Sequence, residues 1–169
     1  MIEVFDLQTI DLILRMVIAM LLGALLGTER RILAHKMAGM RTYALVSMGS
    51  ALFVIISQIV FVQAGSIPSW DLLRMASQIV VGIGFLGAGM IIFHDSKLTG
   101  LTTASSLWVS AGIGIAVGFG LYELAIITTV LTLFIFIVLF FIENKLKEIK
   151  LPQSKSQKFN DDEEHFNNN

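Results

Sequence analysis

Long stretches without a charged residue divide the chain into apolar segments. No Asp, Glu, Lys or Arg occurs in four windows, which cover residues 43–70, 75–93, 98–122 and 124–142. A fifth window, 10–28, is apolar apart from Asp11 and Arg15. A helix that crosses a bilayer needs about 20 mostly apolar residues, so each window is long enough to span a membrane.

Helices, rather than barrel strands, are expected in these windows. Lipid offers the backbone no hydrogen-bond partner, so a spanning segment must be a helix or a strand of a closed barrel. Barrel strands alternate apolar and polar residues, whereas residues 130–142 do not alternate. The pattern predicts an all-α integral membrane protein with five transmembrane helices, at about 10–28, 42–63, 72–93, 101–120 and 122–142.

A change in polarity after residue 142 predicts where the membrane domain ends. Residues 1–142 are expected to form that domain, and 143–169 turn polar at once. A short helical extension is predicted over 143–150. The rest of the tail, rich in Asn, Asp, Glu and Lys, is expected to be disordered, and no second domain is predicted.

Basic residues lie on one side of the predicted membrane domain. The connections 29–41 and 94–100 and the tail contain every Lys and Arg except Arg15 and Arg74. Cytoplasmic loops of membrane proteins carry an excess of Lys and Arg. The N-terminus is therefore expected outside the cell and the C-terminus in the cytoplasm.

Composition narrows the functional classes. Hydrophobic residues make up 55% of the chain and charged residues 15%, against about a quarter charged in soluble domains. The chain has no Cys, which excludes disulfides and thiolate metal sites. Its three His are scattered, so neither an enzymatic activity nor a cofactor is expected. A net charge of −1 argues against nucleic-acid binding.

Parts of the chain resemble each other. Residues 10–16 are similar to residues 70–75, and residues 36–42 are similar to residues 97–103. Gly23 and Gly84 are separated by the same number of residues as the two members of the second pair. A diverged duplication would make the first four helices two parallel copies of one hairpin, with the fifth helix facing lipid. Chance similarity between membrane segments of low diversity is the alternative.

Glycine is concentrated in the predicted helices. The spacing Gly23-xxx-Gly27 in the first helix predicts close packing, because small residues let helix backbones approach each other. The third helix is denser in glycine than one packing seam requires. Two interpretations stay open for it: a packing seam, or a kinked or unwound segment whose carbonyls line a cavity.

Two acid–base pairs lie near the outer ends of the predicted helices. Asp11 and Arg15 are four residues apart and Asp71 and Arg74 three apart, so each pair shares a helix face. Structural ion pairs and an outer vestibule that concentrates cations are the two alternatives. The repeat further predicts that the Asp of one pair meets the Arg of the other.

Charged residues also mark the inner ends of the first two helices. Glu29 and Arg30 end the first helix and Arg41 precedes the second. Glu29 is predicted to clamp the first hairpin by pairing with Arg41. An ordinary basic loop that meets anionic lipid is the alternative.

Five ordered motifs resemble the MgtC/SapB family of bacterial membrane proteins. They begin with Gly23-Ala-Leu-Leu-Gly-Thr-Glu-Arg30 and continue through 38–42, 71–74, 78–89 and 100–114. The resemblance covers about residues 10–142 and implies an inner-membrane location and a link to adaptation to low magnesium. The motifs supply a set of polar and glycine candidates for function, namely Thr42, Gln78, Gly82, Gly84, Gly87, Gly89, Gly100, Thr102, Thr103 and Trp108.

The chain departs from that family in two respects. Well-studied members carry a soluble domain after the last helix, whereas only residues 143–169 follow it here. Some virulence-linked members also have Asn and Cys where this chain has Thr102 and Val109. A virulence-type function is therefore in doubt for this chain.

The expected function is that of a non-catalytic modulator of another membrane complex, linked to magnesium homeostasis. A transporter or channel for a cation such as Mg²⁺ is the alternative. Mg²⁺ prefers oxygen ligands that include one or two carboxylates, and the candidates at membrane depth, Asp11 and Asp71, each adjoin an Arg that opposes cation binding. The expected partners are the lipid bilayer, another membrane complex and a second copy of the chain, with Mg²⁺ as a candidate ligand or substrate.

Overall fold

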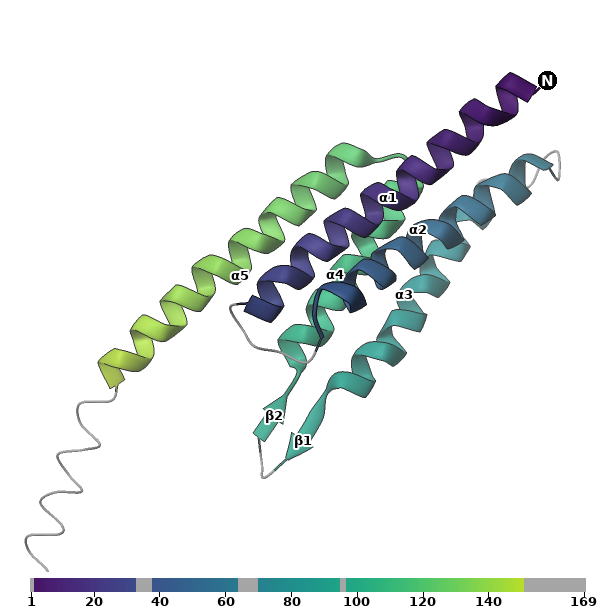
Figure 1. Cartoon of the computed structure of the whole chain (residues 1–169). Coiled ribbons are helices and arrows are strands. Elements are labelled where there is room, and N and C mark those ends of the chain that lie inside the picture. Colours follow the sequence, from purple (N-terminus) through teal and green to yellow (C-terminus); the bar gives the residue numbers. More distant parts are fainter. Residues whose placement is uncertain (1, 33–37, 64–69, 95–96, 151–169) are drawn as a thin grey trace, which may run out of the picture. The chain divides into compact units, whose positions relative to one another are not determined.

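Five helices dominate the computed structural model, which describes residues 2–32, 38–63, 70–94 and 97–150. The helices are α1 (Ile2–Ile32), α2 (Met40–Gln63), α3 (Trp70–Met90), α4 (Leu101–Gly118) and α5 (Tyr122–Lys150) (Figure 1). Each contains a stretch long and apolar enough to cross a membrane. The predicted fold class, an all-α membrane protein with five transmembrane helices, is confirmed.

The observed helix bounds differ from the predicted ones at the start of α1, which begins at Ile2 rather than at residue 10, and between α3 and α4. The third helix ends at Met90 rather than at residue 93, and a short antiparallel pair follows, β1 (Ile92–His94) with β2 (Lys97–Thr99). Gly100 then adopts the left-handed region, with φ of 88°. Its α-carbon faces the Met90 carbonyl so closely that no side chain would fit, which lets the chain reverse immediately after the pair of strands.

Contact between α1 and α2 is made at the level of the backbone. A Cβ atom added to Gly23 would lie 2.5 Å from the Tyr43 carbonyl oxygen and 2.7 Å from Ser47 Cβ. One added to Gly27 would lie 2.6 Å from Met40 Cα. The two helices are therefore antiparallel and touching, and the close packing predicted from Gly23-xxx-Gly27 is confirmed.

Helix α4 is the central element of the unit Met1–Leu133. Of its spanning window, 61% is buried, against 11% for α3. A Cβ atom added to Gly118 would meet the side chain of Val54, and one added to Gly114 would overlap the Ser47 carbonyl. α2 thus lies between α1 on one side and α4 on the other, with its backbone close to both.

Helix α3 is continuous through all of its glycines. Gly82, Gly84 and Gly89 have no atom within 4 Å of an added Cβ, and Gly87 lies 3.6 Å from Ala104 Cβ on α4. Of the alternative of a kinked or unwound segment, the unwound form is therefore wrong. A packing seam is present only at Gly87, and the other three glycines leave bare backbone on the surface of the helix.

The last helix begins after a second glycine with positive φ, Gly120 at 79°. Ala125, Thr129 and Thr132 are buried on one face of α5, and Thr129 donates to the Ala125 carbonyl at 2.8 Å. The chain divides into two compact units, and the second, Phe134–Asn169, contains the rest of this helix. The extension predicted over 143–150 is part of α5, and the tail 151–169 lies outside the described residues.

The contact between α4 and α2 generates a prediction with a matched control on the same helix. Gly114→Leu should prevent α2 and α4 from meeting and cost at least about 3 kcal/mol of stability. Gly112→Leu, two residues away, meets open space and should leave stability unchanged or slightly raised. Thermal unfolding of the purified variants in detergent measures both. Equal stability of the two variants would contradict the packing described.

Candidate functional site

Polar side chains are buried together at one end of α1, α2 and α4. They are at most 9% exposed and come from three different helices. We call this set the polar cluster, which consists of Glu29, Arg30, Tyr43, Thr103, Ser106 and Ser110. Burying so many polar groups at the end of a membrane-spanning bundle is costly unless they are hydrogen-bonded to one another.

Hydrogen bonds connect the members of the polar cluster across all three helices. Arg30 donates to Thr103 Oγ1 at 3.3 Å, which joins α1 to α4. The Tyr43 and Ser106 hydroxyls share a short hydrogen bond between α2 and α4. Ser110 Oγ donates to the Tyr43 carbonyl at 3.0 Å. Arg30 also interacts electrostatically with Glu29 of α1 and Tyr43 of α2. It therefore interacts with groups on α1, α2 and α4.

Glu29 does not pair with Arg41. Its Oε2 atom is buried and has no hydrogen-bond partner among the described residues, whereas the Arg41 side chain is exposed. The predicted clamp is therefore wrong. The reason is positional: Arg41 lies on the outward side of the first turn of α2, while Arg30, next to Glu29, points inward to Thr103.

A second polar site lies at the opposite end of the same three helices. Arg15 forms an ion pair with Asp11 at 2.8 Å. It also donates to Gln58 Oε1 at 3.4 Å and to the Gly118 carbonyl at 3.1 Å. The i,i+4 ion pair expected on α1 is present, and the same Arg connects α1 to the C-terminal ends of α2 and α4.

The predicted crossed pairing is not among the contacts that the structure describes for Arg15, and it stays a prediction. Its contacts are with its own Asp11 and with α2 and α4. α1 packs mainly against α2 and α4, whereas α3 packs against α4 and α2. Arg74 is exposed, and the side chain of Asp71 lies outside the described residues. The internal repeat itself stays a prediction.

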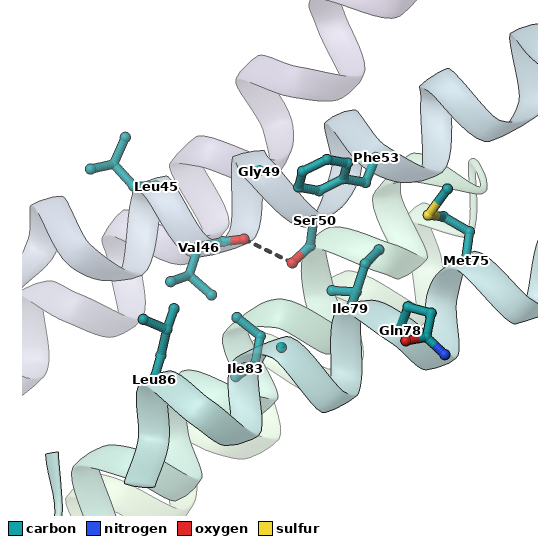
Figure 2. Close-up of a pocket in the computed structure, with 11 residues that line it drawn as sticks. Leu45, Val46, Gly49, Ser50, Phe53, Met75, Gln78, Ile79, Ile83 and Leu86 are labelled. Atoms are coloured by element: carbon teal, nitrogen blue, oxygen red, sulfur yellow. Dashed lines mark hydrogen bonds between the residues drawn. The ribbon is translucent and has the colours of Figure 1, made fainter. Parts of the chain in front are cut away.

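At least three hollows open between helices in the described part of the chain. One of about 500 Å³ lies between α2 and α3 and is almost entirely apolar (Figure 2). Its wall includes Gln78 and Gly82, and its Ser50 hydroxyl donates to the Val46 carbonyl. A second, of about 460 Å³ between α3 and α4, is bordered by Gly84, Gly87 and Trp108. The third, of about 640 Å³, surrounds Asp11 and Arg15 between α1 and α2.

The threonines predicted as candidates from the sequence differ in how far they are buried. Thr103 belongs to the polar cluster, whereas Thr42 and Thr102 are exposed. Tyr43 was not among the candidates predicted from the sequence, although it has a polar hydroxyl at the start of a long apolar run. That position is the signal that could have identified it.

The described residues contain no group of three or more His, Asp or Glu side chains that could hold a metal ion. The polar cluster combines one carboxylate with a guanidinium and four hydroxyls. Such a set can hold three helices in one arrangement, because each hydroxyl and the guanidinium accept or donate across a helix boundary.

Comparison with known proteins gives one consistent result. The pattern of the MgtC family matches residues 16–145. The chain is 42% identical over 130 residues to the Escherichia coli K12 protein named "Putative magnesium transporter YhiD", covering 76% of this chain and 60% of that protein. It is 46% identical over 121 residues to Protein MgtC of Salmonella typhimurium LT2, covering 72% of this chain and 49% of the relative.

A similar relation holds for Protein MgtC of Brucella abortus, at 46% identity over 112 residues, 66% of this chain and 44% of that protein. The chain thus spans about half to three fifths of the length of these relatives. No solved structure matches the chain. The predicted resemblance is confirmed, and the family match together with the five apolar helices indicates an inner-membrane protein.

The hydrogen bond from Arg30 to Thr103 can be tested against the neighbouring Thr102. Thr103→Val removes the oxygen that accepts the Arg30 hydrogen bond while keeping the side-chain shape, and should cost about 1–2 kcal/mol. Thr102→Val changes an exposed residue and should cost almost nothing. Thermal unfolding in the same detergent compares them. Equal effects would mean that the hydrogen bond from Arg30 does not stabilise the bundle.

Proposed function

The chain belongs to the MgtC family, and from that premise we propose that it is a non-catalytic modulator of another membrane complex, linked to magnesium homeostasis. It would act by presenting one of its transmembrane helices to a helix of its partner. The observation that supports this proposal most is the open glycine surface of α3.

Helix α3 is the least buried of the spanning helices. Phe85 is 81% exposed, Val81 is also exposed, and Gly84 between them has nothing within 4 Å of an added Cβ. In lipid, helices associate mainly through close backbone approach and dispersion, for which bare glycine is the usual requirement. A surface of this kind suits contact with another transmembrane helix.

The interior of the bundle favours a modulator over a transporter. Between the polar cluster and the Arg15 site, the contacts of α1, α2 and α4 are made by small and apolar residues without solvent exposure, including Ala19, Val54, Ile113 and Val117. An ion that crossed the described bundle there would meet no charged side chain, and its polar contacts would include only isolated hydroxyls such as those of Ser47 and Ser50. Such a crossing is costly in a low-dielectric interior.

The orientation of the chain belongs to this proposal. The basic connections and tail assign the polar cluster to the cytoplasmic side and the Arg15 site to the outer side. A reporter that is active only in the cytoplasm should work when fused after Lys150 and fail when inserted within 64–69. The opposite pattern would reverse the orientation.

The open surface of α3 supplies the test of the modulator. Gly84→Leu should abolish the ability of the chain to restore growth of a deletion strain in low magnesium, because leucine blocks close approach by a partner helix. The amount of folded protein in the membrane should not change, since nothing contacts Gly84. Val130→Leu, at an exposed position of α5, is the control and should restore growth. Full growth with Gly84→Leu would contradict the proposal.

A cation transporter or channel is the second candidate. The hollow beside the half-exposed Asp11 favours it, as does the name of the Escherichia coli relative, a putative magnesium transporter. Mg²⁺ flux into liposomes that contain only the purified chain tests it directly. On the modulator proposal no flux above protein-free liposomes is expected. If the purified chain carries Mg²⁺ and Asp11→Asn abolishes that flux, the modulator proposal is wrong and the chain is a transporter.

A further inference from the structure

The lining of the hollow beside Arg15 contains both polar and apolar side chains. Asp11, Arg15 and Gln58 bring a carboxylate, a guanidinium and an amide together. Its apolar side chains from α2 include Ile55 and Ile59, which are called the apolar wall below. With a volume of about 640 Å³, the hollow is large enough for a small organic group. A ligand that fits it must therefore be amphiphilic.

The depth of the hollow in the membrane supports the same conclusion. Its lining includes Gln8, the first residue of the spanning stretch of α1, and Gln63, the last residue of the spanning stretch of α2. The hollow is therefore at the end of two spans, where the hydrocarbon meets the polar headgroups of the lipids. A lipid headgroup can reach this position without leaving the bilayer.

The Arg15 side chain is 22% exposed and lines the hollow, so a ligand can reach part of its guanidinium. The terminal nitrogens already interact with Asp11, Gln58 and the Gly118 carbonyl, which hold the guanidinium in place. The planar guanidinium is well suited to phosphate oxygens, which it binds through directional, charge-assisted hydrogen bonds.

Asp11 restricts which phosphate-containing headgroup can bind. Its side chain is 46% exposed, so carboxylate lone pairs remain accessible beside the ion pair with Arg15. A headgroup with only negative charge would be repelled by this carboxylate, and a lone cation would be repelled by Arg15. A headgroup that carries a phosphate and an ammonium with N–H donors satisfies both residues.

We propose that this hollow is a binding site for a zwitterionic aminophospholipid of the phosphatidylethanolamine type, with the phosphate on Arg15 and the ammonium on Asp11. The acyl chains would lie along the apolar wall of α2. Phosphatidylcholine lacks N–H donors and phosphatidylglycerol lacks the cation, so both should bind less well. The proposal does not rest on the modulator function proposed above.

Lipid retention tests the assignment. The purified full chain is exchanged from an equimolar mixture of phosphatidylethanolamine, phosphatidylcholine and phosphatidylglycerol in detergent, and the retained lipid is quantified by mass spectrometry. The wild type should retain phosphatidylethanolamine with a roughly tenfold preference over each of the others, as one charge-assisted hydrogen bond would give. Equal retention of the three lipids would overturn the proposal.

Variants locate the preference at the hollow. Asp11→Asn keeps the shape of the side chain and should abolish the preference for phosphatidylethanolamine over phosphatidylglycerol. Glu123→Gln removes an exposed acid from the first turn of α5 and should leave the preference unchanged. A preference that survives Asp11→Asn would place the lipid elsewhere and overturn the assignment.

A displacement experiment distinguishes a bound lipid from a bound soluble zwitterion. Glycerophosphoethanolamine has the same headgroup and no acyl chains, and it should displace the lipid only weakly because it leaves the apolar wall uncovered. Displacement at concentrations comparable with those of the lipid would overturn the lipid assignment. It would define a site for a soluble zwitterion instead.

Discussion

The packing of α2 between α1 and α4 at Ser47 is the constraint on which the rest of the membrane domain depends. Gly23 of α1 lies against Ser47 from one side and Gly114 of α4 from the other, and neither position has room for a side chain. Lipid tails are as apolar as leucine, so the hydrophobic effect does little to drive helices together within the bilayer. Close contact between backbones supplies the cohesion instead.

That close contact decides where the polar groups can meet. The polar cluster lies toward one end of α1, α2 and α4 and the Arg15 site toward the other, with the apolar contacts of Val54, Ile113 and Val117 between them. Each site contains one Arg of α1 that bonds α4, at Thr103 and at the Gly118 carbonyl. Because these bonds have defined partners, they set the register of α1 against α4, which dispersion between small residues alone would leave loosely specified.

The sequence predicted the parts of this structure that depend on local pattern. Apolar windows located the five helices, and the i,i+4 spacing predicted the Asp11–Arg15 pair. Contacts between helices were harder, because a pattern along one helix does not say which neighbour it faces. The glycines of α3 illustrate this: their density left a packing seam and a kinked or unwound segment both open, yet most of them have no protein atom within 4 Å of an added Cβ. The turn of strands after Met90 was missed because Ile91 and Ile92 continue the apolar run.

The two predicted hairpins differ in a way that bears on function. If they are copies, Gly84 of α3 corresponds to Gly23 of α1, yet Gly23 is in contact with α2 whereas Gly84 contacts nothing. The same chemical feature is thus used inside the chain in the first hairpin and left available in the second. Glycine on an exposed helix costs helix stability without a packing gain in return. A contact outside the chain would recover that cost, which is why the open surface belongs to α3 and not to α5, whose exposed face is rich in Ile, Leu and Phe and contains no glycine.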